Sequence, residues 1–426
     1  MSEGIGYKIK YFRTKANMTQ EELARGIVSV SYLSKIERNS ADPNPEAIEK
    51  ICQRLEIQPE RVLDHNINNL VYQWFNQLLD GNMIMAHETY QQIEEEIEKV
   101  IDADLYWLVE LHTLFYFILT NQLKYAKRKY IFLEQDMSHF NEIEQYYWLK
   151  FSGYYNYSNL AYEDAFQSYL RAEKMMPEAL VNNQQEKHDL YFQISCVATR
   201  LYYTYHSTVY VKRALDYYRN TYQLRRCAEC HIIFGVAYKR MNEVNEALTN
   251  FELARKIAIE LDEREVLVRC NQAMGELYGD MQLTEQAIHY YMHCYELTKH
   301  SFTESELIAV TGLFKTYYND GKLEKAKQWH KEAGKLVNHE LTISQPLNYE
   351  ISIYYYLIYG FDQGFEVLME KEVLPFFKSK KMYLNYAYYL QITGDYYYQV
   401  RKYKVSSNYY REANEALNQL RLRDNN

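Results

Sequence analysis

A spacing of small and aromatic side chains recurs along most of this chain and limits what it can fold into. In the full pattern, a small residue and an aromatic residue stand three positions apart, and an alanine follows with an aromatic residue four positions after it. Three copies fit well: Gly235, Tyr238, Ala247, Phe251 and Ala254; Gly275, Tyr278, Ala287, Tyr291 and Cys294; and Gly394, Tyr397, Ser406, Tyr410 and Ala413, in which Ser406 replaces the alanine. The small residue lets two antiparallel helices approach closely, and the aromatic ring one turn away fills the groove beside it.

The same frame extends in both directions and resembles the tetratricopeptide (TPR) repeat. A weaker copy consists of Phe314, Tyr317, Ala326, His330 and Ala333, and partial copies are Ala86 with Tyr90, Ala126 with Tyr130, Ala165 with Tyr169, Ala214 with Tyr218, and Phe365 with Met369. The anchors at 86, 126, 165, 214, 247, 287, 326, 365 and 406 are mostly 39 to 41 residues apart, with one interval of 49 and one of 33. We therefore expect about nine helix pairs in a right-handed superhelix, whose concave surface is lined by the first helix of each pair.

Length and composition agree with an all-α repeat array. A chain of 426 residues is too long for one compact core, because single cores stop growing near roughly 250 to 300 residues. Only 14 Gly and 6 Pro interrupt it, which favours long helices. The predicted fold class is all-α, with an N-terminal helix-turn-helix bundle followed by the repeats.

The first residues predict that bundle. A helix is expected from Gly6 to Lys15, and a second from Thr19 to Arg25, where Thr19 and Glu22 have the spacing of a capping box. After the turn at Gly26, Ser29 caps a third helix, with Leu33 and Ile36 facing inward. Further helices are expected over residues 44–55 and around residues 61–63.

Charge separates this end from the rest. The whole chain carries a formal net charge of −9, whereas its first forty residues hold seven basic and four acidic side chains. A locally basic end on an acidic protein is typical of a small DNA-binding module attached to a larger sensor.

The string from Thr19 to Asn39 resembles the phage-repressor-like helix-turn-helix family over about 60 residues, which implies a DNA-binding domain at 1–65 and a repeat domain at 66–426. In that family the glutamine after the capping threonine and the first turns of the third helix contact DNA. The DNA-binding residues that this resemblance implies are Lys15, Gln20, Ser29, Val30, Ser31, Tyr32, Ser34, Lys35, Arg38 and Asn39.

Several motifs suggest chemistry that we do not expect. Cys227, Cys230 and His231 match a haem-attachment or metal spacing, and His289 and His293 lie one helical turn apart. Both sets fall on predicted repeat helices, where core packing or solvation is the simpler interpretation, and no phosphate loop or nucleophile motif was found. We expect no enzyme activity, no metal and no cofactor. Because no signal peptide or apolar span is evident, we expect a cytoplasmic protein that does not enter the membrane.

A helix-turn-helix joined directly to TPR-type pairs resembles the peptide-sensing regulators of Gram-positive bacteria, the RRNPP group, and most of all its neutral protease regulator branch. This resemblance implies quorum sensing: a short, secreted and re-imported signalling peptide is held in the repeat groove and switches a homo-oligomer, dimer or tetramer, on a double-stranded DNA operator. It also implies that the peptide-free form restrains a response regulator of the sporulation phosphorelay. Two alternatives stay open, a TPR scaffold or phosphorelay antagonist and a phage lysis-lysogeny regulator.

An extended peptide needs hydrogen-bonding and charged partners along the groove. The predicted peptide-binding residues are Arg128, Arg200, Tyr203, His206, Lys239, Arg240, Arg269, Asn271, Gln272, Lys315 and Asn319. Their basic bias predicts a ligand that carries a carboxylate.

Overall fold

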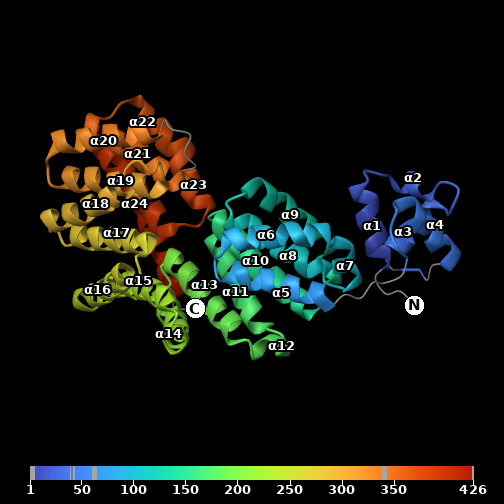
Figure 1. Ribbon diagram of the computed structural model, residues 1–426. Helices are drawn as coiled ribbons and strands as arrows, with labels where there is room; N and C mark the ends of the chain where they lie inside the picture. The colour runs from blue at the N-terminus through green and yellow to red at the C-terminus, as the bar shows by residue number, and fades with distance from the viewer. Residues whose placement is uncertain (1–4, 39, 42–43, 60–64, 338–342, 425–426) are drawn as a thin grey trace. The chain divides into compact units, whose positions relative to one another are not determined.

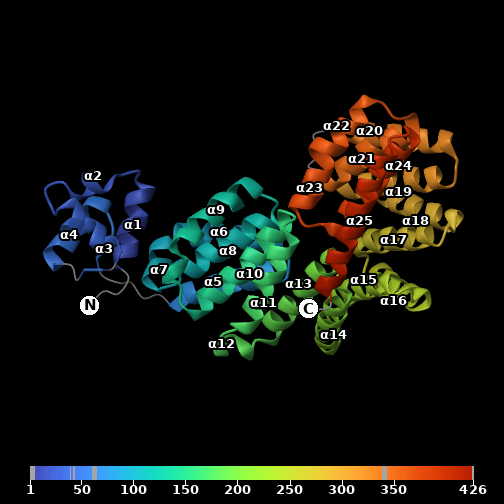
Figure 2. The same ribbon diagram turned by 180° about the vertical axis from the view of Figure 1, so that it is seen from behind.

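The computed structural model describes residues 5–38, 40–41, 44–59, 65–337 and 343–424, and within these residues it contains helices and no strand. The chain divides into two compact units, Met1–Ser158 and Asn159–Asn426. Figures 1 and 2 show the helices of each unit from opposite sides. The predicted all-helical fold is therefore confirmed, whereas the count of nine pairs and the handedness stay predictions. The domain boundary at 65/66 also stays a prediction.

The first unit begins with the helix-turn-helix. Its helices are α1 (Ile5–Lys15), α2 (Gln20–Ala24), α3 (Val30–Glu37), α4 (Pro45–Leu55), α5 (His65–Leu79), α6 (Met83–Glu95), α7 (Ile97–Asp102), α8 (Tyr106–Leu119), α9 (Leu123–Asp136), η1 (Met137–His139) and α10 (Glu142–Ser158). Helices α1 to α4 enclose their own small core around Ile9, Leu33 and Ile36. The predicted short helix at residues 61–63 lies outside the described residues.

The second unit consists of packed helix pairs. Its helices are α11 (Tyr162–Lys174), α12 (Glu178–Val181), α13 (Gln184–Leu201), α14 (Thr204–Asn220), α15 (Leu224–Arg240), α16 (Val244–Glu260), α17 (Arg264–Asp280), α18 (Thr284–Thr298), α19 (Glu304–Asn319), α20 (Leu323–Val337), α21 (Gln345–Tyr359), α22 (Gln363–Leu368), η2 (Met369–Val373), α23 (Leu374–Ser379), α24 (Tyr383–Gln399) and α25 (Tyr403–Asp424). Neighbours such as α15 with α16 and α24 with α25 pack along their length. The short helix α12 lies in the interval of 49 residues between anchors and accounts for its length.

The repeat anchors lie in the core, as the pattern predicts. All nine anchor side chains, from Ala86 to Ser406, are at most 2% exposed. A methyl group built on Gly235 would approach the Phe251 ring to 2.3 Å, and one on Gly394 would approach the Tyr410 ring to 2.7 Å. Both rings belong to the second helix of the same pair, so glycine is what permits this close contact.

The turns inside the pairs share a backbone conformation. A residue with positive φ stands five positions before eight of the nine anchors: Gly81, Asn121, Leu160, Asn242, Gln282, Gly321, Gly360 and Arg401. A residue with positive φ thus follows the first helix at each of these turns, before the chain turns back into the second helix. The register between anchor and turn is therefore the same at eight of the nine anchors.

The second unit closes on itself. The terminal helix α25 contacts α14, and Lys380 Nζ donates to the Asn159 carbonyl oxygen at 2.7 Å, across 221 positions of sequence. In Figure 2 helix α25 runs from α24 toward α14. The first helices of successive pairs line a cavity inside this unit.

Candidate nucleic-acid interface and ligand groove

Helix α3 presents a continuous exposed face. The Ser29 hydroxyl accepts the Tyr32 backbone N–H at 3.2 Å and caps the helix, as expected. Leu33 and Ile36 are fully buried beneath it. The exposed side chains are Ser29, Val30, Ser31, Lys35 and Arg38, with Tyr32 and Ser34 half-buried beside them.

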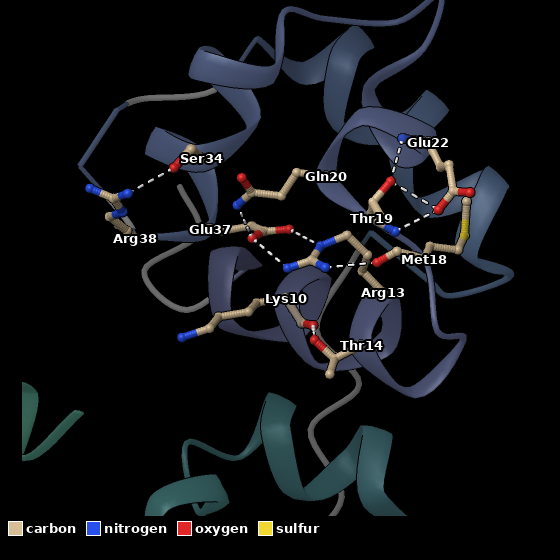
Figure 3. Close-up of polar contacts among 10 residues, drawn as sticks. All are labelled: Lys10, Arg13, Thr14, Met18, Thr19, Gln20, Glu22, Ser34, Glu37 and Arg38. Atoms are coloured by element: carbon tan, nitrogen blue, oxygen red, sulfur yellow. Dashed lines mark hydrogen bonds and ion pairs between the residues drawn. The ribbon is translucent and has the colours of Figure 1, made fainter. Parts of the chain in front are cut away.

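A buried carboxylate holds α3 against its neighbours (Figure 3). Glu37 is 2% exposed and pairs with Arg13 of α1 through Nε at 2.6 Å and Nη2 at 3.0 Å. Gln20 of α2 donates to the same carboxylate at 2.7 Å. The predicted capping box between Thr19 and Glu22 is also present. Three helices therefore share one charged hydrogen-bond centre, which fixes the exposed face of α3.

This centre refines the roles assigned from sequence. Gln20 uses its amide N–H on Glu37, so in this structure it acts through the position of α3. The Tyr32 hydroxyl accepts the Asn44 backbone N–H at 3.3 Å, and Arg38 donates to the Ser34 hydroxyl at 3.0 Å. Sequence reasoning missed Arg13 and Glu37, although a charge next to inward-facing Ile36 was a signal for a buried pair.

Two of the predicted DNA-binding residues stand apart. Asn39 lies outside the described residues. Lys15 is at the end of α1, with its Nζ 5.8 Å from the ring centre of Tyr11 and 5.9 Å from that of Phe12, and it lines a cavity against the repeat helices. It does not share the exposed face of α3.

The second unit contains a cavity of about 1010 Å³. It is lined mainly by first helices, namely α15, α17, α19, α21 and α24, as the repeat pattern predicts for the concave surface. Three of the predicted peptide-binding residues line it: Lys239, Lys315 and Asn319. Thr311 also lines it, and the buried hydroxyl of this residue has no hydrogen-bond partner among the described residues.

The charged side chains of this cavity can be compared with the carboxylate ligand that we expected. Its lining carries two ammonium groups and four carboxylates, those of Glu276, Asp280, Asp320 and Glu350. Lys239 lies 3.4 Å from Glu276 and 2.9 Å from Asp280, and Lys315 pairs with Glu350. Burial opposes the charge of each lysine, but the carboxylates outweigh it and raise the pKa of both lysines. These ion pairs neutralise the cations of the cavity, so its lining does not favour the expected carboxylate ligand, and the chemistry of the ligand stays a prediction.

The remaining predicted peptide residues do not line this cavity. Arg200 and Tyr203 border a crevice of only about 10 Å³, the His206 ring packs edge-on against Phe166, and Arg240 stacks on Tyr202 at 3.9 Å. Arg269 pairs with Glu229 at 3.2 Å, Gln272 donates to the Ser305 carbonyl oxygen at 3.4 Å, and Asn271 is fully buried beside His293 at 3.0 Å. Arg128 belongs to the first unit.

The spacing of Glu276 and Asp280 in the sequence could have placed them in the groove. Glu276 and Asp280 continue the face of α17 that begins at Gln272, in steps of four residues. Selecting only nitrogen-bearing side chains left them out.

The two cysteines of the haem-like or metal-like spacing lie in the interior of the repeats. Cys227 and Cys230 are buried, and burial raises the pKa of the Cys230 thiol. No group of three or more His, Cys, Asp or Glu among the described residues is placed to hold a metal ion.

Within the described part of the chain, no helix is long and apolar enough to cross a membrane.

Together these features define a helix-turn-helix protein with an appended array of helical repeats. Residues 9–62 match the family described as "Helix-turn-helix". The chain is 29% identical over 406 residues to the Transcriptional activator NprA of Geobacillus stearothermophilus, covering 93% of this chain and 99% of that one. It is 24% identical to the Response regulator aspartate phosphatase A of Bacillus subtilis (strain 168), over 64% of this chain and 75% of the relative.

Solved structures share the fold. A Rap protein complexed with Competence and Sporulation Factor has a TM-score of 0.72 at 19% identity, covering 84% of this chain and 99% of that one. NprR in complex with its cognate peptide NprX has a TM-score of 0.69 at 18% identity, covering 84% and 100%. The resemblance to the RRNPP group and its neutral protease regulator branch is thereby confirmed.

Proposed function

We propose that this chain is a peptide-switched transcription regulator that acts in the cytoplasm. It binds an operator through the exposed face of α3 and a short signalling peptide through the groove of the second unit. The proposal rests on the presence, in one chain, of a capped helix α3 held by a buried ion pair and of a cavity of about 1010 Å³ lined mainly by first helices. The similarity to a protein named as a transcriptional activator supports activation as the direction of control.

The peptide should place a positive group in the groove. Four carboxylates face two already paired lysines there, so a basic side chain or a free amino terminus finds complementary charge. The Thr311 hydroxyl, which has no partner in the described part of the chain, can pair with a peptide backbone group, and this bond relieves the cost of its burial.

The DNA part is tested with fragmented genomic DNA of the source organism. The full-length protein selects bound fragments, and fluorescence anisotropy on a selected fragment then compares Lys35→Ala with Lys50→Ala, an exposed lysine of α4 outside the α3 face. If Lys35 contacts a base edge, its loss weakens binding by about 1 to 3 kcal/mol while Lys50→Ala has little effect. Equal affinity of wild type and Lys35→Ala would remove Lys35 from the interface.

The peptide part is tested with the small-peptide fraction of spent culture medium. Native mass spectrometry should show a peptide retained by the wild-type protein and lost from Thr311→Val, which keeps the shape of the side chain. Thr249→Val is the matched control, because the Thr249 hydroxyl bonds only to its own helix, at 2.9 Å from the Asn245 carbonyl oxygen. Retention of the same peptide by Thr311→Val at equal occupancy would exclude that hydroxyl from the site.

A second role concerns a response regulator. Relatives at 22% to 24% identity are named response regulator aspartate phosphatases, which supports a phosphorelay partner for this chain as well. We propose that this partner is restrained by binding rather than by catalysis. Incubation of the full chain with an acetyl-phosphate-charged response regulator should leave the phosphoryl half-life unchanged, whereas a shortened half-life would show phosphatase activity.

A further inference from the structure

A second cavity, of about 520 Å³, lies within the first unit between the DNA-binding domain and the first repeat helices. Helix α1 forms one wall, and helices α6, α8 and α9 form the other. Helix α1 is anchored to α7, because the buried Lys8 ammonium lies 2.9 Å from Asp102 and 2.9 Å from Glu98. The cavity is therefore a built feature of the contact between the two parts.

Aromatic rings make up much of its wall. The Tyr7 ring meets Trp107 edge-on at 5.8 Å, Tyr11 meets Tyr106 edge-on at 5.5 Å, and Phe132 stacks on Trp107 at 5.9 Å. Each α1 ring thus contacts a ring of α8. The edges and faces of aromatic rings pack well against the flat apolar part of a ligand.

Cations dominate the charged groups of the lining. Four basic side chains, Lys10, Lys15, Arg128 and Lys129, face two carboxylates, Glu94 and Glu110. Lys129 pairs with Glu110, and Lys10 lies 3.6 Å from Asp136. Lys15 and Arg128 make no ion pair within the described part of the chain, so two positive charges from opposite walls stay available.

We propose that this cavity binds a small planar aromatic anion, with its apolar body among the rings of α1 and α8 and its anionic group between Lys15 and Arg128. Its volume falls within the range of roughly 300 to 1,000 Å³ that is usual for small-molecule sites, and its lining has the usual mixture of many rings and few charges. Burial, with Glu110 and Glu94, raises the pKa of Tyr11 to about 12, so its hydroxyl stays a neutral donor at the wall. A ligand here contacts both the DNA-binding domain and the repeats, and it acts independently of the peptide groove.

The test uses 2-naphthoate as the probe and its neutral counterpart 2-naphthamide, titrated into the full-length protein by isothermal calorimetry. The naphthoate should bind with one molecule per chain, and the naphthamide should bind at least about fivefold more weakly, because it lacks the charge. Arg128→Gln should weaken naphthoate about fivefold. Lys127→Gln is the matched control, since it removes the same charge from an adjacent exposed residue of α9 that does not line the cavity.

Four results would overturn the proposal. Absence of naphthoate binding to the intact chain would refute the site, and equal binding of naphthamide would refute the anionic class. Equal loss in Arg128→Gln and Lys127→Gln would show a diffuse charge effect. If Arg128→Gln weakens the binding of operator DNA but leaves naphthoate binding intact, Arg128 serves DNA phosphates and its assignment to the anionic group of the ligand is excluded.

Discussion

Single glycines set how closely the repeat helices approach. Gly235 faces the fully buried Phe251 ring, whereas Gly334 has open space where a side chain would begin. Both lie inside helices, so alanine at either position gains up to about 1 kcal/mol of helix propensity.

We predict that Gly235→Ala destabilises the second unit by about 1 to 3 kcal/mol, because overpacking outweighs the gain in propensity. Gly334→Ala should be neutral or slightly stabilising. Urea unfolding monitored by far-UV circular dichroism measures both. A Gly235→Ala protein as stable as Gly334→Ala would show that the helices are not in close contact there.

A buried histidine gives the first unit a pH dependence. The His112 ring stacks on Phe75 at 3.4 Å, and its Nδ1 lies 2.7 Å from the Leu108 carbonyl oxygen. Burial lowers the pKa of His112 to about 3. Its pKa in the unfolded chain is about 6.5, so protons favour the unfolded state.

This stability is fully present above pH 6.5 and is lost as the pH falls toward 3. Between pH 6 and 5 we predict a loss of about 1.4 kcal/mol per pH unit from this residue. The His112→Phe variant should lack that slope, so the difference between the two unfolding free energies should change with pH. Parallel pH profiles for the two proteins would contradict the neutral, buried state of His112.

At the scale of elements, the orientation of α3 depends on one carboxylate. Glu37 binds Arg13 and Gln20, and its side chain is buried in the centre of the three helices. Breaking a buried ion pair from one side leaves the other charge uncompensated.

Glu37→Ala should therefore destabilise the helix-turn-helix by about 3 kcal/mol and speed amide hydrogen exchange in α1 to α3. Exchange in the second unit should not change. Glu46→Gln, which alters only an exposed pair with Lys50, is the control and should leave exchange in α1 to α3 as it was. Unchanged exchange in Glu37→Ala would show that packing alone positions α3.

Helix boundaries, caps and buried faces were the features that the sequence predicted best. Caps at Thr19 and Ser29, inward Leu33 and Ile36, and the buried anchors all follow from local spacing, because 3.6-residue periodicity and capping act within one or two turns. The acidic lining of the groove could not be found from cationic side chains alone. Lys239 and Lys315 are basic in sequence, but partners on other helices neutralise them.

For the whole molecule, long-range closure lies beyond sequence periodicity. The hydrogen bond from Lys380 to Asn159 and the contact of α25 with α14 join distant parts of the second unit. They depend on the accumulated rotation of every repeat between them, which no single spacing specifies. The cavity beside α1 was also not predicted from the sequence. Its residues Lys15 and Arg128 are 113 positions apart, and the sequence analysis assigned them to different sites.

Operator binding should involve a homo-oligomer. One helix-turn-helix contacts a single half-site, so we predict that two chains bind one operator and that log affinity falls linearly with log salt. Analytical ultracentrifugation of labelled operator across a salt series measures both. A single chain on DNA at every concentration would contradict the oligomeric form.

Coupling between the peptide groove and DNA binding by α3 is tested most directly by titrating labelled operator with the full-length protein, with and without the peptide recovered from its groove. We predict that the peptide changes operator affinity in the wild type. In Thr311→Val the same amount of peptide should have a smaller effect, while peptide-free affinity is preserved. Identical titrations of the wild type with and without bound peptide would contradict this coupling, because the groove and α3 would then work independently.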